Sequence, residues 1–271
     1  MLAKRGIQGR GKGIVAVEIN LSGQSAVVFG VANHRSIAWA IAQQLHAAGA
    51  HLIVTYQNER MGRAVLELVK DMGRTEAIEC DVLDEASIST AIAAASAGGP
   101  LAVVVHSVAF ANREDLEGAF SATGPEGFQT ALEVSAYSLL PVARAAASNM
   151  PTGGSILTLT FHAADKVYPG YNVMGVAKAA LENEVKQLAA EYGPSGIRVN
   201  ALSAGPLNTL AARGISGFAG MHEIHAQRSP LRRNITQEEV GTAALFLASK
   251  LSSGITGHIL YVDAGYNVMG V

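Results

Sequence analysis

The segment SAVVFGVANHRSIA, residues 25–38, indicates the fold class of this chain. A short apolar run begins at Ser25 and ends at Gly30, and Ser36 is a favoured N-cap residue that opens a helical segment. Apolar residues recur on one face of that segment, at Ile37, Ile41 and Leu45. A buried strand, a glycine turn and an amphipathic helix together predict the first half of a βαβ unit.

The same alternation continues to the C-terminus. Seven runs rich in Val, Ile and Leu are candidate strands: Ser25 to Gly30, His51 to Tyr56, Glu76 to Val82, Leu101 to Val108, Gly154 to Phe161, Ile197 to Ala204 and His258 to Asp263. Their nearly continuous apolar character is typical of strands buried on both faces of a sheet. A later helix is expected after Thr236, which forms a capping box with Glu239. Strands that alternate with helices predict right-handed βαβ units and a parallel sheet.

Composition limits the partners and the compartment. The 271 residues suit one α/β domain, and a net charge of -2 argues against general binding to nucleic acid or an anionic membrane. No apolar run approaches the ~20 residues that span a bilayer. The one cysteine, Cys80, allows no internal disulfide and fits a reducing cytoplasm. No HxxxH or CxxC spacing predicts a metal site, and His222 and His225 are expected on the surface.

Two segments stand apart from the strand and helix pattern. Residues 1–20 form a glycine-rich tail, basic up to Gly13. The tail lacks the apolar core of a secretory signal, so we expect a disordered tail or an upstream start codon, with a targeting peptide as the alternative. The folded domain is expected over residues 21–271. Within it, residues 208–233 show no strand pattern, and we expect either a mobile lid over a site or a plain surface excursion.

Several strand ends carry candidate ligand contacts. Gly30 would let the backbone approach a pyrophosphate, which free N–H groups at the following helix N-terminus would bind. Asp81-Val82 would meet an adenine amino group or only end a strand. The small residues within 106–109 leave room for a flat ligand, or simply pack. Pro206 fixes the turn after the sixth strand, where Thr209 would bind a phosphate or only complete the turn.

Tyr171 and Lys178 are the sharpest pair of candidate catalytic residues. They lie seven positions apart, close to two helical turns, so both project from one face about 10 Å apart along the axis. Both can therefore reach one ligand lying between them without touching each other. A nearby ammonium would favour the phenolate and make the Tyr171 hydroxyl a better acid. Such a pair is often accidental, but its place after the fifth strand of a nucleotide-type sheet argues for function.

With these residues taken together, the chain resembles the divergent branch of the short-chain dehydrogenase/reductase superfamily. From about Leu21 to Val271 the chain is similar to the bacterial enoyl-acyl-carrier-protein reductases. That branch has Gly, five residues, then Ser-x-Ala, which Gly30, Ser36 and Ala38 match, and it separates its catalytic Tyr and Lys by six residues. The short sequences YNVMG, VNALSAGP and VDAGY are also similar to motifs of the family. The resemblance implies a single-domain, Rossmann-type, doubly wound parallel sheet of seven strands, usually assembled as a homotetramer.

The resemblance also implies a role for each site residue. Tyr171 and Lys178 would be catalytic, with Lys178 also on the nicotinamide ribose. The cofactor, NADH or else NADPH, would be bound by Gly30, Ser36, Ile37, Gln57, Asp81, Val82, Val108, Lys178, Leu207, Asn208, Thr209, Leu210 and Ala211. The acyl substrate would be bound by Ala111, Phe161, Met174, Pro206, Ile215, Phe218 and Met221.

Two features depart from the family pattern. Phe161 stands where many members have a second tyrosine, ten residues before the catalytic one. Some members also carry basic lid residues that are thought to meet the acidic carrier protein, and here Ser216, Ala219 and Gly220 stand instead.

The implied activity is NADH-dependent reduction of the trans-2 double bond of an enoyl thioester on acyl carrier protein, in type II fatty-acid synthesis. Tyr171 would hydrogen-bond the thioester oxygen as negative charge develops there, while Lys178 orients the cofactor. One alternative is a 3-oxoacyl reductase, which would need serine and lysine where this chain has Thr158 and Gly175. The other is a cofactor-sensing regulator, which should have lost the tyrosine or the lysine.

Overall fold

The structure is a computed structural model, and it describes residues 18–209, 212 and 217–270. The basic stretch at the start of the tail, together with Leu210, Ala211 and Ile215, lies outside the described residues. The seven predicted strands are confirmed to within a few residues: β1 (Ser25–Phe29), β2 (His51–Tyr56), β3 (Thr75–Glu79), β4 (Leu101–His106), β5 (Gly154–Thr160), β6 (Ile197–Ala204) and β7 (Ile259–Val262).

These strands form one parallel sheet in the order β3-β2-β1-β4-β5-β6-β7. In its centre Val28 of β1 pairs with Val54 of β2 on one side and with Val105 of β4 on the other. The chain order reverses between β1 and β4. In doubly wound sheets a ligand crevice opens beyond the carboxyl ends of the strands at such a reversal.

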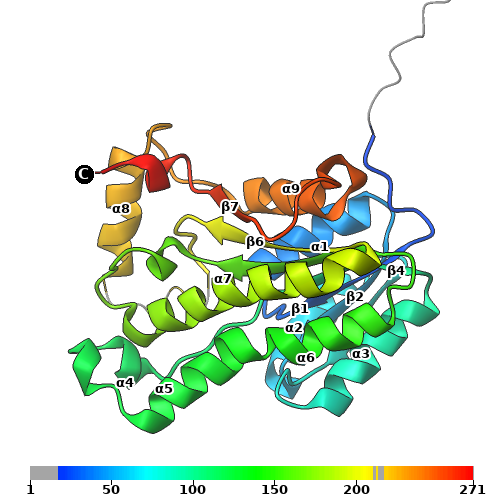
Figure 1. Cartoon of the computed structure of the whole chain (residues 1–271), viewed down its shortest axis with the longest axis horizontal. Helices are drawn as coiled ribbons and strands as arrows, with labels where there is room; N and C mark the ends of the chain where they lie inside the picture. Colours follow the sequence, from blue (N-terminus) through cyan, green and yellow to red (C-terminus); the bar gives the residue numbers. More distant parts are fainter. Residues whose placement is uncertain (1–17, 210–211, 213–216, 271) are drawn as a thin grey trace, which may run out of the picture.

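Helices cover both faces of the sheet (Figure 1). One face is covered by α1 (Ile37–Ala47), α2 (Glu59–Val69) and α9 (Gln237–Ala248). The other is covered by α3 (Glu85–Ala97), α6 (Leu139–Ser148) and α7 (Asn172–Tyr192). Beyond the carboxyl ends of the strands lie α4 (Arg113–Leu116), α5 (Pro125–Leu132) and α8 (Phe218–Arg228). The doubly wound α/β fold implied by the sequence is therefore confirmed.

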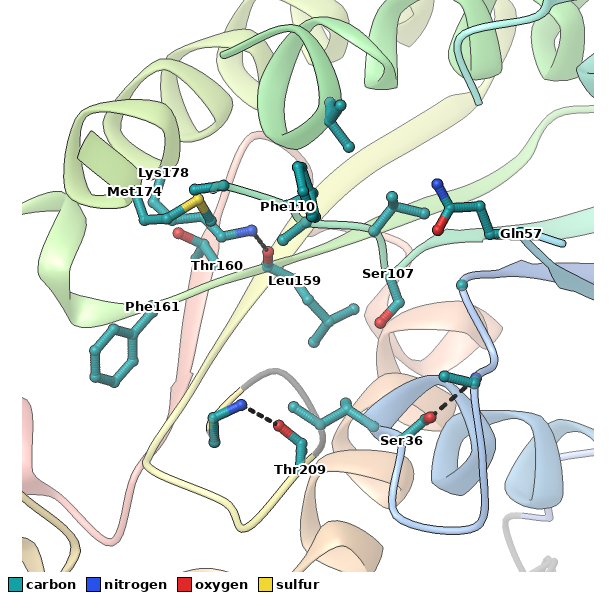
Figure 2. A pocket seen from close by; sticks show the side chains of 18 of the residues that line it. Ser36, Gln57, Ser107, Phe110, Leu159, Thr160, Phe161, Met174, Lys178 and Thr209 are labelled. Carbon is teal, nitrogen blue, oxygen red and sulfur yellow. Dashed lines mark hydrogen bonds between the residues drawn. The ribbon is translucent and has the colours of Figure 1, made fainter. Parts of the chain in front are cut away.

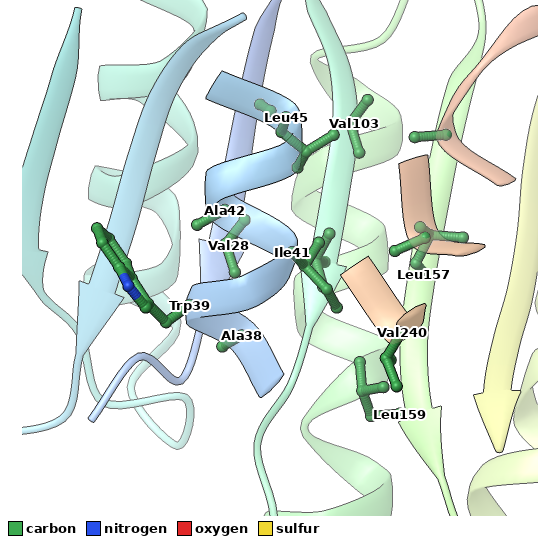
Figure 3. Packing of buried hydrophobic residues seen from close by; sticks show 14 of the residues in the cluster. Val28, Ala38, Trp39, Ile41, Ala42, Leu45, Val103, Leu157, Leu159 and Val240 are labelled. Atoms are coloured by element: carbon green, nitrogen blue, oxygen red, sulfur yellow. The ribbon is translucent and has the colours of Figure 1, made fainter. Parts of the chain in front are cut away.

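Two apolar cores hold these layers together. Figure 3 shows one of them, where Ile41 and Leu45 of α1 pack against Val28 and Val103 of the sheet. Each of these four side chains is essentially inaccessible to water, and burying one aliphatic side chain contributes roughly 1.5–3 kcal/mol. The capping box predicted at Thr236 is present and fixes the start of α9.

The expectation that every strand is buried on both faces is wrong for the two edge strands. No residue of β3 or β7 is fully buried, whereas β1 is buried throughout. The physical reason is position, since an edge strand has a neighbour on one side only. The half-buried apolar residues of β7 leave an apolar sheet edge on this chain.

Candidate active site

A cavity of about 790 Å³ opens where the carboxyl ends of the strands meet the first turns of α1 and α7. Its lining combines the turn after β1, the ends of β2 to β6 and the N-terminal half of α8. Figure 2 shows that Ser36, Gln57, Phe161 and Lys178, which are far apart in the sequence, surround one space.

The β1–α1 turn has a geometry that only glycine supports. Gly30 has φ +92°, and a Cβ on it would lie 2.2 Å from the Ser107 carbonyl oxygen. Ser36 occupies the N-cap position as predicted, but its Oγ accepts hydrogen bonds from Ala32 N–H and Asn33 N–H, both at 3.1 Å, and caps no helical N–H. The serine therefore shapes the turn. Trp39 N–H donates to the Ser36 carbonyl, which leaves the N–H groups of Ile37 and Ala38 in the first turn of α1 for an anion.

The ends of β2 and β3 supply the next part of the lining. Gln57, just after β2, is exposed and neutral and lies on the cavity wall. Asp81 and Val82 follow β3 and line the same wall, and the Asp81 carboxylate accepts a hydrogen bond from Leu83 N–H at 3.0 Å. One carboxylate oxygen of Asp81 is thus used by the local turn, which holds the side chain in place.

Lys178 is buried in the cavity wall with one hydrogen bond to protein. Its side chain is only 4% exposed, and Nζ donates to the Leu159 carbonyl at 2.8 Å (Figure 2). Burial lowers the pKa of this ammonium to about 8, against a smaller raising effect of Glu182. An ammonium has three protons to donate, so two remain for a ligand.

Tyr171 occupies the N-cap position of α7, and its side chain lines the cavity beside Phe161, with ring centroids 5.1 Å apart. Burial raises the pKa of the Tyr171 phenol. The expectation that Lys178 would make this phenol more acidic is therefore wrong, because desolvation of the phenolate dominates. Tyr171 is a neutral hydrogen-bond donor here.

Most of the other predicted site residues reach this cavity. It is lined by Val108, Leu207, Thr209, Ala111, Phe161, Met174, Pro206, Phe218 and Met221. Asn208 is exposed and does not line it. Leu210, Ala211 and Ile215 lie outside the described residues, so their predicted places stay predictions.

The structure adds residues that the sequence did not single out. Ser135, in the π-helical turn η2 (Glu133–Tyr137), accepts from Phe110 N–H at 2.9 Å and lies 3.0 Å from the Phe110 carbonyl. These bonds fix the cavity-lining loop after β4. The Leu159 carbonyl that holds Lys178 was also missed, because a backbone acceptor has no sequence signature.

Thr158 stands at the position where a 3-oxoacyl reductase would need a serine, and it does not face the cavity. Its Oγ1 is fully buried, lies 3.0 Å from Nδ1 of His106 and donates to the His106 carbonyl at 3.1 Å. His106 is equally buried, and burial lowers its pKa to about 3, so it is a neutral structural residue. This geometry disfavours the carbonyl-reductase alternative.

A nicotinamide dinucleotide fits the residues of this cavity. The N–H groups of Ile37 and Ala38 suit a pyrophosphate, and the two remaining ammonium protons of Lys178 suit ribose hydroxyls. Among the residues that the structure describes, no three His, Cys, Asp or Glu side chains gather as metal ligands. No helix in the same part of the chain is long and apolar enough to cross a membrane.

Fold and site together define a dinucleotide-dependent reductase of the short-chain dehydrogenase type. The family described as enoyl-(acyl carrier protein) reductase matches residues 30–267. The enoyl-acyl-carrier-protein reductase (NADH) FabI of Nostoc sp. (strain PCC 7120) is 50% identical over 257 residues, which cover 93% of this chain and 100% of the relative. FabI of Bacillus subtilis (strain 168) is 48% identical over 93% of this chain and 99% of the relative. This chain belongs to the enoyl-acyl-carrier-protein reductase family.

Solved structures of enoyl-acyl-carrier-protein reductases have the same fold as this chain. The Bacillus cereus enoyl-acyl-carrier-protein reductase, solved with NADP+ and an indole naphthyridinone, has a TM-score of 0.90 at 47% identity and covers 94% of this chain and 100% of its own. The Anaplasma phagocytophilum enzyme in complex with NAD has a TM-score of 0.87 at 42% identity, over 94% and 96% of the two chains.

Proposed function

We propose that this protein reduces the trans-2 double bond of enoyl thioesters carried on acyl carrier protein, with NADH, in type II fatty-acid synthesis. One observation carries the proposal: Tyr171 and Lys178 line a single cavity that also holds the first turn of α1 and an apolar wall. The apolar wall suits an acyl chain, and the family assigns the reaction class.

The two ends of the cavity suit the two ends of the cofactor. Gln57, Asp81 and Val82 would hold the adenosine half, and Lys178 with Val108 would hold the nicotinamide half. The bound nicotinamide would supply a hydride to the β-carbon of the substrate. Tyr171 would donate a hydrogen bond to the thioester oxygen, and its raised pKa keeps the proton on the phenol as negative charge grows on that oxygen.

The acyl chain would lie against Phe161, Met174 and the first turns of α8, which contribute Phe218 and Met221. On this basis α8 would belong to a substrate lid near residues 208–233. This helix is suited to cover the cavity, because it contributes two apolar side chains to the lining and is otherwise largely exposed.

A homotetramer in the cytoplasm is the expected working form. The apolar edge at β7, and the exposed Val268 and Met269 just beyond it, are surfaces that a second copy would cover. Cys80 is a buried free thiol, in keeping with a reducing compartment.

One assay tests the function. Oxidation of NADH and of NADPH is followed by the loss of reduced-nicotinamide absorbance with crotonyl and longer trans-2-enoyl thioesters, and with a 3-oxoacyl thioester alongside. We expect turnover of the enoyl thioesters only. Turnover of the 3-oxoacyl substrate alone would refute the proposal.

A further inference from the structure

A cluster of one half-buried tyrosine and two buried histidines lies next to the cavity but does not line it. The Tyr168 hydroxyl is 3.2 Å from Nδ1 of His162 and 3.4 Å from Nε2 of His225. Both imidazoles are buried, so the expectation that His225 lies on the surface is wrong. The hydroxyl therefore connects two segments that are far apart in the sequence: the loop that precedes α7, and the helix α8.

His225 is the one fully buried side chain of α8. Its ring stacks on Tyr266, with centroids 3.6 Å apart and an interplanar angle of 15°. Phe218 and Met221 precede it by seven and four positions, which places all three on one face of the helix. A second tie comes from Asn234, whose amide lies 3.0 Å from Nδ1 of His222. The imidazole of His225 is thus a main attachment of the helix that covers the cavity.

At its other end the cluster contacts the catalytic side. The Tyr168 ring packs on Phe161 with centroids 4.7 Å apart, and Phe161 packs on Tyr171 at 5.1 Å. A continuous row of rings therefore runs from His225 through Tyr168 and Phe161 to Tyr171. Phe161 has no hydroxyl, so the polar tie in this row comes from Tyr168.

The cluster is neutral near pH 7, so each imidazole offers the Tyr168 hydroxyl either a donor or an acceptor nitrogen. Burial lowers the pKa of His225 to about 4, lowers the pKa of His162, and raises the pKa of Tyr168. A neutral ring nitrogen either donates or accepts, and a phenol offers one donor. One histidine therefore accepts the Tyr168 proton, while the other can donate to the phenol oxygen.

We propose that Tyr168 is a positioning residue: its hydroxyl ties α8 to the stretch before α7, and so holds Phe218 and Met221 over the acyl end of the cavity. The acyl ligand rests on the proposed function, whereas the tie itself does not. When the tie is lost, α8 spends part of its time out of place, and the apparent substrate affinity falls by the fraction lost.

The test is Tyr168→Phe, which keeps the ring on Phe161 and removes only the hydroxyl. Tyr137→Phe is the matched control, because Tyr137 is half exposed and outside the cluster. For a trans-2-dodecenoyl thioester we expect KM to rise about two- to tenfold from the loss of the one hydrogen bond that reaches α8, between Tyr168 and His225, with kcat within about threefold. The KM for NADH should stay unchanged. In hydrogen exchange without ligand, the α8 amides should exchange faster in Tyr168→Phe and unchanged in the control.

A second pair of variants separates hydrogen bonding from packing. His225→Phe keeps an aromatic ring against Tyr266 but offers Tyr168 no polar atom, so it should match Tyr168→Phe. His225→Gln restores a polar partner and should fall closer to the wild type.

Unchanged KM and unchanged exchange of α8 in Tyr168→Phe would overturn the proposal. A fall in melting temperature with no change in KM or α8 exchange would also overturn it, since that is the result of a merely structural role. Should the wild type turn over no enoyl thioester, the proposed function fails, and the exchange experiment still decides whether the tie exists.

Discussion

Replacing Lys178 by methionine should weaken NADH binding and at the same time stabilise the cofactor-free protein. Burial lowers the pKa of this lysine from 10.5 to about 8. At about 1.4 kcal/mol per pH unit, that difference costs the folded state about 3 kcal/mol while the lysine is charged. Methionine removes this cost but leaves the Leu159 carbonyl without the Nζ hydrogen bond, a loss of about 1 kcal/mol. The net expectation is a gain of about 2 kcal/mol at pH 7.

The gain should depend on pH in one direction. Because the pKa is lower in the folded state, the unfolded chain holds this proton more tightly, and unfolding takes up a proton between about pH 8 and 10.5. The cost is fully present below about pH 8 and disappears as the pH rises to 10.5. The wild type should therefore gain stability relative to the variant across this window.

Two measurements test the predicted effects of Lys178→Met on stability and on NADH binding. Urea unfolding of the cofactor-free proteins at pH 7 and pH 10 gives the free energies, and a fluorescence titration gives the affinity for NADH. Lys186→Met, an exposed lysine of the same helix, should change neither. If Lys178→Met lowers stability at pH 7, the burial argument is wrong; if it leaves NADH affinity intact, Lys178 does not hold the cofactor.

Three further outcomes are expected. NADH should be preferred over NADPH in kcat/KM, because Gln57 offers no positive charge to an extra phosphate; a clear preference for NADPH would contradict this. Tyr171→Phe should lower kcat about a hundred- to a thousandfold with little change in KM, whereas Phe161→Tyr should change kcat less than about tenfold; nearly full kcat in Tyr171→Phe would remove the oxyanion role. Gly30→Ala should cost about 2 kcal/mol or more in unfolding free energy, because an L residue is strained at φ +92° and its Cβ would meet the Ser107 carbonyl; an unchanged unfolding midpoint would show that the turn can relax.

The sequence was sufficient for the sheet and for most of the cavity. Strand runs and the glycine turn are local signals, because apolar periodicity and a positive φ are properties of neighbouring residues. Gly30, Tyr171 and Lys178 could be placed at strand ends and on one helix face for the same reason, and the structure brings them to one cavity.

What the sequence could not supply depends on contacts between distant segments. The pKa of Tyr171 is raised because its side chain is buried, and the spacing of residues in the sequence does not reveal that burial. Ser36 was found as an N-cap, but its hydroxyl serves the preceding turn instead of the helix. His225 looks like a surface residue on a polar helix until Tyr168 and Tyr266 are seen around it.

The order of the sheet also bears on how the chain reaches its folded form. Ser25 pairs with Leu101, and all of β2 and β3 lies between them in the chain. Closing so long a loop is slow, so the β1–β4 pairing is expected to be a late event in folding. Gly30 meets Ser107 at that seam, so the cofactor crevice forms only once the seam has closed. Bound NADH should then slow unfolding while leaving the refolding rate nearly unchanged, which stopped-flow refolding with and without NADH would measure.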